Sequence, residues 1–219
     1  MPASGMRPSL PPIGREVRAI LSNMAEPLGL AVGNALEVAE AVDCLRGEGP
    51  ADLRELCVVL AAEVLSASGF DHTPADIAAA LDDGSAFERF ERWVKAQGGD
   101  PGSLDALPLA PDQELVRAGA EGVVAELDAR AVGEAAGLLG GGRAHKGEAV
   151  DHGVGVVLHA KVGTQVSAGE PLATVHHRSG RGLAEARAKL EGAVRLADRA
   201  SPLPLIVETG LGAERRDVA

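Results

Sequence analysis

Residues 27–42 read PLGLAVGNALEVAEAV, a Gly/Pro turn followed by an acidic helix. Gly33 lets the backbone pass tightly, and Asn34 is expected to cap the helix by accepting a hydrogen bond from a free amide. Apolar residues recur at helical spacing and predict a buried stripe made of Ala35, Val38, Ala39, Val42 and Leu45. Glu37 and Glu40 then lie together on the other side, which indicates either a solvated helix start or a cation site.

Composition and charge narrow the class of protein. The 219 residues are 46% hydrophobic but only 2% aromatic, so a core must come from closely packed Ala, Val and Leu. A net charge of -11 argues against binding to nucleic acid or to an anionic membrane. The first residues, MPASGMRPSLPP, lack the apolar stretch of a signal peptide, and no run is long enough to span a bilayer. A cytoplasmic protein is expected.

The first part of the chain is predicted to be a strand followed by helices. Residues 1–14 are rich in proline and form an irregular lead-in. The segment VRAILS at 17–22 is apolar on both faces, as in a mostly parallel sheet, and without its neighbours it would become an exposed, self-associating edge. Ser85 and Glu88 have the spacing of a capping box. A helix over residues 52–67 is expected to face the core with Leu53, Leu56, Cys57, Leu60 and Val64.

A loop that ends near residue 110 divides the chain into a first part, residues 15–110, and a second part, residues 111–219. The second part alternates short strands with glycine-rich turns. GVVAELD at 122–128 predicts a strand, and apolar spacing predicts a helix over 183–199. The apolar segment LPLIV near the end of the chain predicts a further strand.

Two motifs resemble one family. Asn23, Met24 and the string PLGLAVGNALEV closely resemble a segment of the thymidine and pyrimidine nucleoside phosphorylases. Residues 162–172 show a V-G-x-x-V-x-x-G-x-P-L pattern that resembles barrel-sandwich hybrid domains and is similar to the C-terminal domain of that family. The resemblance implies a fold of α/β plus α+β class, in which the C-terminal part of a mixed α/β domain precedes a barrel-sandwich hybrid (α/β-hammerhead-like) domain.

The resemblance also implies a cation site at the helix start. In the family, potassium or a calcium-like cation is held by two loop carbonyls and one helix carboxylate. Matched residue by residue, these ligands are the carbonyl oxygens of Leu28 and Ala31 and the side chain of Glu40, which are the oxygen donors that such a cation requires. Arg143 follows three glycines in a loop that lies toward the cleft in the family. We expect it either to close over an anion or to form a structural ion pair.

Other polar residues support weaker interpretations. His176 and His177 end a predicted strand with no third ligand spaced nearby, so we expect solvent exposure rather than metal binding. The modified lysine of a biotinyl or lipoyl carrier domain would lie at a hairpin tip. Lys146 lies in HKGE, ahead of the strand, so its position does not favour a carrier function.

The resemblance implies a function for the complete enzyme. The family cleaves a pyrimidine nucleoside with inorganic phosphate and releases the free base and a pentose 1-phosphate. Its Lys-His-Ser phosphate loop and its base-binding residues belong to upstream segments, and this sequence contains no Lys-His-Ser. We therefore expect the C-terminal portion of such an enzyme, inactive alone, with a complementing N-terminal half or a second copy as partner. The alternative is a non-enzymatic remnant that acts as a binding or assembly module.

Overall fold

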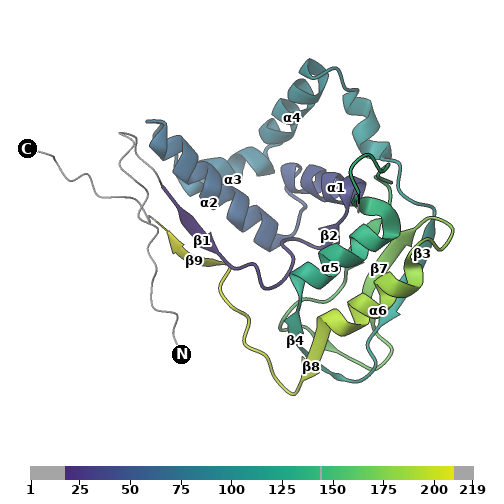
Figure 1. The fold of residues 1–219 in the computed structure, drawn as a ribbon. Coiled ribbons are helices and arrows are strands. Elements are labelled where there is room, and N and C mark those ends of the chain that lie inside the picture. Colours follow the sequence, from purple (N-terminus) through teal and green to yellow (C-terminus); the bar gives the residue numbers. More distant parts are fainter. Residues whose placement is uncertain (1–17, 144, 210–219) are drawn as a thin grey trace, which may run out of the picture.

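The structure, a computed structural model, describes residues 18–143 and 145–209. A layer of helices packs beside a β-rich body, and a two-stranded ribbon lies next to the helices (Figure 1). The helical layer consists of α1 (Asn34–Leu45), α2 (Ala51–Ala67), α3 (Pro74–Asp82), α4 (Ser85–Ala96) and the 3-10 helix η1 (Pro101–Ala106). None of the helices in the described part of the chain combines the length and the apolar character that a bilayer crossing needs.

Every strand pairing in the described residues is antiparallel. The four-stranded sheet has the order β2-β5-β7-β3 and is built from Ala31–Val32, Gly155–Leu158, Pro171–His177 and Asp112–Arg117. The three-stranded sheet has the order β6-β4-β8 and is built from Gln165–Val166, Gly122–Leu127 and Val194–Ala197. The strand predicted over 122–128 is thereby confirmed as β4.

The remaining two strands form the ribbon. β1 (Ile20–Ser22) pairs with β9 (Ile206–Thr209), and Ile20 lies opposite Thr209. In the described residues the partner of this strand comes from the later chain and runs antiparallel to it, so the mostly parallel sheet expected with upstream neighbours stays a prediction. Val17, the predicted start of the strand, lies outside the described residues.

The β-rich body has its own apolar core. α5 (Ala129–Ala136), a π turn (Gly137–Gly141) and α6 (Leu183–Ala193) lie over the strands (Figure 1). As the low aromatic content predicts, the largest fully buried side chains are aliphatic: Val116, Val124, Val132, Leu139, Val154, Val156, Val166 and Val175. Leu30 and Val32, from the segment before α1, pack against the same cluster. The motif region therefore belongs to this core as well as to the helical layer.

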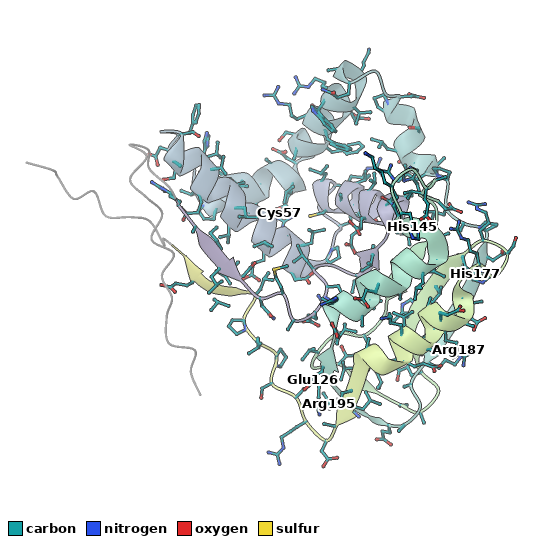
Figure 2. All side chains as sticks on the ribbon, viewed as in Figure 1. Cys57, Glu126, His145, His177, Arg187 and Arg195 are labelled. Carbon is teal, nitrogen blue, oxygen red and sulfur yellow. The ribbon has the colours of Figure 1, made fainter. Side chains whose placement is uncertain are left out.

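α2 carries apolar side chains that the described residues cover only in part. The helix has no buried residue, and Leu60 and Val64 are 44% and 63% exposed. Cys57, from the same predicted stripe, is exposed (Figure 2). Leu21 on β1 and Val207 on β9 are also exposed. The prediction that the stripe of α2 faces a core is wrong for the described residues, because Leu53 and Leu56 are only half-buried and the rest of the stripe is exposed.

The predicted capping box lies at a different helix. α4 begins after Gly84, which has φ 80° and provides no side-chain cap, so the box predicted for Ser85 and Glu88 is wrong. Instead, Thr73 Oγ1 accepts from the amide of Asp76 at 3.2 Å, and Asp76 Oδ2 accepts from the amide of Thr73 at 2.7 Å. Aspartate at the third helical position therefore replaces the glutamate of the usual box.

The last predicted helix is shorter than expected. α6 ends at Ala193, and the chain passes directly into β8. Glu126 on β4 and Arg195 on β8 form a cross-strand ion pair with 2.6 Å between Oε1 and Nη2 (Figure 2). Pairing with β4 outweighs the helical apolar spacing, since strand formation depends on the neighbouring strand more than on local preference.

Candidate cation site

The loop that precedes α1 closes around the carboxylate of Glu40. Gly29 has φ 67°, and a Cβ atom there would lie 2.2 Å from Glu40 Oε2. Gly33 has φ 143°, and a Cβ atom there would lie 2.6 Å from the carbonyl oxygen of Val154. A side chain at either position would clash as well as strain the backbone. The glycines thus bring the loop onto Glu40 on one side and onto the chain leading into β5 on the other.

Glu40 uses one carboxylate oxygen to hold the loop. Its Oε1 accepts hydrogen bonds from the amides of Leu30 and Ala31, at 2.7 and 3.0 Å. Within the described ranges, Oε2 accepts no hydrogen bond. Burial raises the pKa of Glu40, and the two amide hydrogen bonds offset only part of that effect. The second oxygen of this half-buried carboxylate, Oε2, is therefore available to a bound cation.

Ala31 lies at an open sheet edge beside that oxygen. β2 is an edge strand, and the Ala31 amide points away from β5 toward Glu40. Because the N–H and C=O of one strand residue point to the same side, the Ala31 carbonyl faces this edge too. A pocket of about 400 Å³ borders it, with Glu40, Asp43 and Glu48 as charged lining and no basic side chain. The site fits a cation that binds oxygen, and the carbonyl ligands assigned to Leu28 and Ala31 stay a prediction.

The other two polar residues of the motif have roles that differ from those predicted. Gly33, not Asn34, is the N-cap of α1, and no side chain caps the helix from that position. Glu37 Oε1 accepts from the Gly33 amide at 2.9 Å. Asn34 Nδ2 donates to the carbonyl oxygen of Gly141, also at 2.9 Å. The two glutamates therefore do not share a solvated face, since each carboxylate turns back to the loop before the helix.

Three further residues hold the loop, and the sequence analysis did not identify them. Lys161 Nζ donates to the carbonyl oxygen of Pro27 at 2.7 Å and to Asp52 Oδ2 at 2.5 Å. Asp52 Oδ2 accepts from the Gly29 amide at 3.1 Å. Glu26 Oε2 accepts from the amide of Val162 at 2.9 Å. No local pattern signals these contacts, because 109 residues separate Asp52 from Lys161.

The charges of this cluster influence one another. Burial opposes ionisation of Asp52, but the hydrogen bond and the positive charge of Lys161 hold the pKa of Asp52 below its usual range. The charge of Asp52 acts to raise the pKa of Glu40, and that of Lys161 acts to lower it. One ammonium therefore stands beside two half-buried carboxylates, which leaves one negative charge for a bound cation.

The predicted cleft loop contacts the motif through Gly141, whose carbonyl oxygen accepts the hydrogen bond from Asn34. Gly140 has φ 104°, and a Cβ atom there would lie 3.1 Å from Nη1 of Arg181. Arg143 is exposed. No acidic group lies within ion-pair distance of Arg143 in the ranges 18–143 and 145–209. The structural ion pair is thus not found, and a role for Arg143 in a cleft stays a prediction.

The histidine pair is not solvent-exposed. His176 is 7% exposed, and its Nδ1 has no hydrogen-bond partner. It lies on β7, which runs between β5 and β3 in the four-stranded sheet. Burial lowers the pKa of His176. Among the residues that the structure describes, no three His, Cys, Asp or Glu side chains gather as metal ligands.

Comparison with known proteins identifies the family. The profile of the pyrimidine nucleoside phosphorylase C-terminal domain matches residues 123–197. Thymidine phosphorylase of Mycobacterium tuberculosis (strain H37Rv) is 45% identical over 196 residues, which are 89% of this chain. Over most of its length the chain matches the thymidine and pyrimidine nucleoside phosphorylase family. Other phosphorylases of this family that it matches include the pyrimidine-nucleoside phosphorylases of Bacillus subtilis (strain 168), 41% identical over 89% of this chain, and Geobacillus stearothermophilus, 43% identical over 75%.

The chain spans less than half of the length of the relatives that it matches. The aligned part is 45% of the M. tuberculosis protein, 46% of the B. subtilis protein and 40% of the G. stearothermophilus protein. The family profile describes a C-terminal domain. More than half of each relative therefore has no counterpart in this chain.

Proposed function

We propose that this chain is the C-terminal portion of a pentosyltransferase that cleaves thymidine or uridine with inorganic phosphate in cytoplasmic nucleoside salvage. In that reaction a phosphate oxygen attacks the anomeric carbon on the face opposite the base. The glycosidic bond breaks, and the base leaves with the electron pair. Alone, the chain is inactive, because the phosphate-binding and base-binding segments lie in the part of the enzyme that it does not contain.

The uncovered apolar surface of α2 carries this proposal. Leu60 and Val64 on α2, together with Leu21 and Val207 on the ribbon, are each at least 44% exposed. An amphipathic helix normally buries such a stripe, and an open ribbon edge normally pairs or is covered. Relatives at 41–45% identity are about twice as long, so the missing layer fits their additional chain.

Within the complete enzyme this portion supplies scaffold and ion ligands. The two antiparallel sheets, with orders β2-β5-β7-β3 and β6-β4-β8, support a barrel-sandwich hybrid (α/β-hammerhead-like) domain. Leu28 and Ala31 carbonyl oxygens and Glu40 would hold potassium or calcium, whose charge favours phosphate nearby. Arg143, exposed beyond the glycine turn, would close over the anionic substrate. The complete enzyme would bind a pyrimidine nucleoside and phosphate, and it is proposed to form a homodimer.

A complementation assay tests the proposal. The chain is expressed alone and together with the unmatched N-terminal portion of the M. tuberculosis thymidine phosphorylase, and phosphorolysis of thymidine and of uridine is followed by release of the base. We expect no turnover from either part alone and phosphate-dependent turnover from the pair. Replacing Leu60 and Val64 together by aspartate should abolish assembly, whereas Ala188→Asp on the exposed side of α6 should not.

Each other outcome has a definite meaning. Turnover by the isolated chain would show that the chemistry is placed wrongly. Assembly without turnover, for a complex in which the N-terminal portion is folded, would favour the non-enzymatic binding or assembly module. Absence of both assembly and turnover would contradict the proposed use of the α2 surface.

A further inference from the structure

The loop that offers the carbonyl ligands has little regular structure to hold it. β2 contains only Ala31 and Val32 and pairs with two residues of β5. Residues 27–30 belong to no strand or helix, and Gly29 among them has a left-handed φ of 67°. Apart from the hydrogen bond from the Leu158 amide to the Leu30 carbonyl, at 2.8 Å, residues 27–30 therefore depend on contacts from side chains.

A single ion pair supplies two of those contacts. Lys161 Nζ donates to the Pro27 carbonyl at 2.7 Å, and Asp52 Oδ2 accepts from the Gly29 amide at 3.1 Å. The ammonium and the carboxylate lie 2.5 Å apart. Their side chains are only 20% and 26% exposed, so solvent screens this pair less than a surface pair. The pair thus holds the peptide groups on both sides of Leu28.

The geometry of the peptide bond gives this contact a consequence for the cation site. The C=O of Leu28 and the N–H of Gly29 belong to one peptide group, which is planar and trans. The hydrogen bond from that N–H to Asp52 therefore fixes the plane of the group, and the Leu28 carbonyl must point away from Asp52. Rotation of this peptide would turn the carbonyl to a different direction.

The turn that carries Lys161 is itself fixed. The Lys161 amide donates to Thr164 Oγ1 at 3.1 Å, and the Thr164 amide donates back to the Lys161 carbonyl at 2.9 Å. The next amide, that of Val162, donates to Glu26 Oε2 at 2.9 Å. The V-G turn of the β-rich body is thus joined to the loop at two points.

We propose that Lys161, acting through Asp52, is a positioning residue that orients the Leu28 carbonyl toward the cation site of Glu40. The ammonium does not touch substrate or cation. It holds Asp52 in place and neutralises it, so that the Glu40 charge remains for the ion. Without the ammonium, the half-buried carboxylates of Asp52 and Glu40 would repel each other. The peptide group between Leu28 and Gly29 would then no longer be held in one orientation. This inference rests on the proposed cation site.

The test uses the 219-residue chain and two readouts that need no enzymatic activity. The melting temperature is titrated with potassium chloride and with calcium chloride, and choline chloride keeps the ionic strength constant. Hydrogen exchange of the amides of residues 29–31 is followed at low salt. The variants are Lys161→Met, Asp52→Asn and Glu40→Gln. Lys189→Met is the matched control, because it removes an ion pair of the same 2.5 Å length, to Glu134, elsewhere in the chain.

We expect Lys161→Met to raise the cation concentration for half-maximal stabilisation by about tenfold or more, as loss of an outer-shell partner does at metal sites. Exchange at residues 29–31 should also become faster, while the amides of β7 remain protected. Asp52→Asn, which keeps an oxygen acceptor for Gly29, should act in the same direction with a smaller effect. It keeps the test decisive if Lys161→Met does not fold. Lys189→Met should change neither readout.

The possible failures can be told apart. If Glu40→Gln abolishes the cation response but Lys161→Met and Asp52→Asn leave it unchanged, the positioning role is wrong and the cation site stands. If the unmodified chain shows no response to potassium or calcium beyond that to choline, the cation site and the positioning role are both wrong. A cation response that shifts with Lys161 supports the inference whatever the complementation assay gives.

Discussion

Asn34 Nδ2 donates a hydrogen bond to the carbonyl oxygen of Gly141 across 2.9 Å, and the two residues are 107 positions apart in the sequence. The contact joins the first residue of α1 to the glycine turn that precedes Arg143. The position of the predicted cleft loop therefore depends on the same motif that supplies the candidate cation ligands.

Removal of this contact should loosen the loop around Arg143. We expect Asn34→Ala to lower the free energy of unfolding by about 1 kcal/mol, the usual net value of one hydrogen bond, and to speed tryptic cleavage after Arg143. Asn23→Ala is the control, because it removes a side-chain hydrogen bond to the Ala25 amide without touching the loop. Equal cleavage rates in the two variants would contradict a role for Asn34 in holding the glycine turn.

Gly29 should tolerate substitution much less than a glycine with the same backbone strain and free space. Gly29→Ala places a Cβ atom 2.2 Å from Glu40 Oε2, whereas Gly84, with φ 80°, has nothing within 4 Å of an added Cβ. We expect Gly84→Ala to cost about 1 to 2 kcal/mol from backbone strain alone. Gly29→Ala should cost clearly more. Urea denaturation measures both, and similar values would show that the loop does not enclose Glu40 as described.

Glu40 and Glu37 should differ in their effect on cation binding. Among the described residues, Glu40 Oε2 has no hydrogen-bond partner, whereas Glu37 Oε1 accepts from the Gly33 amide just before α1. We expect Glu40→Gln to abolish stabilisation by potassium or calcium in the complementing pair. Glu37→Gln should lower the melting temperature slightly and leave the cation response intact. Equal loss of the response in both variants would reject Glu40 as the specific ligand.

His176 should make stability depend on pH. Burial holds its pKa below the value in the unfolded chain, so the unfolded state binds the proton first as the pH falls. The stabilisation is therefore complete above the unfolded pKa of about 6.5. It is lost as the pH falls from there toward the folded pKa, with a slope of at most about 1.4 kcal/mol per pH unit. Urea unfolding between pH 5 and 8 should give a flatter profile for His176→Leu than for the unmodified chain.

The comparison variant for this experiment is His72→Leu, which changes an exposed histidine. Its profile should follow that of the unmodified chain. If His176→Leu retained the full pH dependence, the acid sensitivity would have to come from other groups.

The uncovered face of α2 should drive self-association of the isolated chain. We expect sedimentation to show concentration-dependent association that is reduced when Leu60 and Val64 are both replaced by aspartate. Because these side chains are 44% and 63% exposed, the free energy of unfolding should change by no more than about 0.5 kcal/mol per substitution. A monomer that sediments unchanged at all concentrations, before and after substitution, would contradict the role of this surface.

Local motifs could be predicted from the sequence where the chain itself enforces them. Gly33, predicted to let the backbone pass tightly, has a positive φ and lies close to Val154, and the segment GVVAELD forms the strand β4. Helix caps were less predictable, because the box at Thr73 uses aspartate and the Asn34 side chain bonds a distant turn. At α1 the distant carbonyl of Gly141 takes the Asn34 side chain, and no side chain caps the helix.

Contacts between distant segments could not be predicted. Lys161 and Asp52 show no local pattern that would indicate their pairing. The apolar stripe of α2 predicts a buried face, but it cannot show that the described chain leaves that face largely exposed. The sequence of β8 predicts a helix, and the pairing with β4 makes this segment a strand. The parts of the site that depend on long-range packing are therefore those that the sequence left open.

The two-residue strand β2 limits where this fold can be divided by recombination or by engineering. It lies before α1 in the sequence, yet it forms the border of the four-stranded sheet through Ala31 and Val32. A recombination point between the helices and the later strands would strip that border from the sheet and take Leu30 out of its apolar cluster. The β-rich body is consequently not an exchangeable module, and a successful chimera should inherit the stretch from Pro27 to Val32 from the same parent as β5.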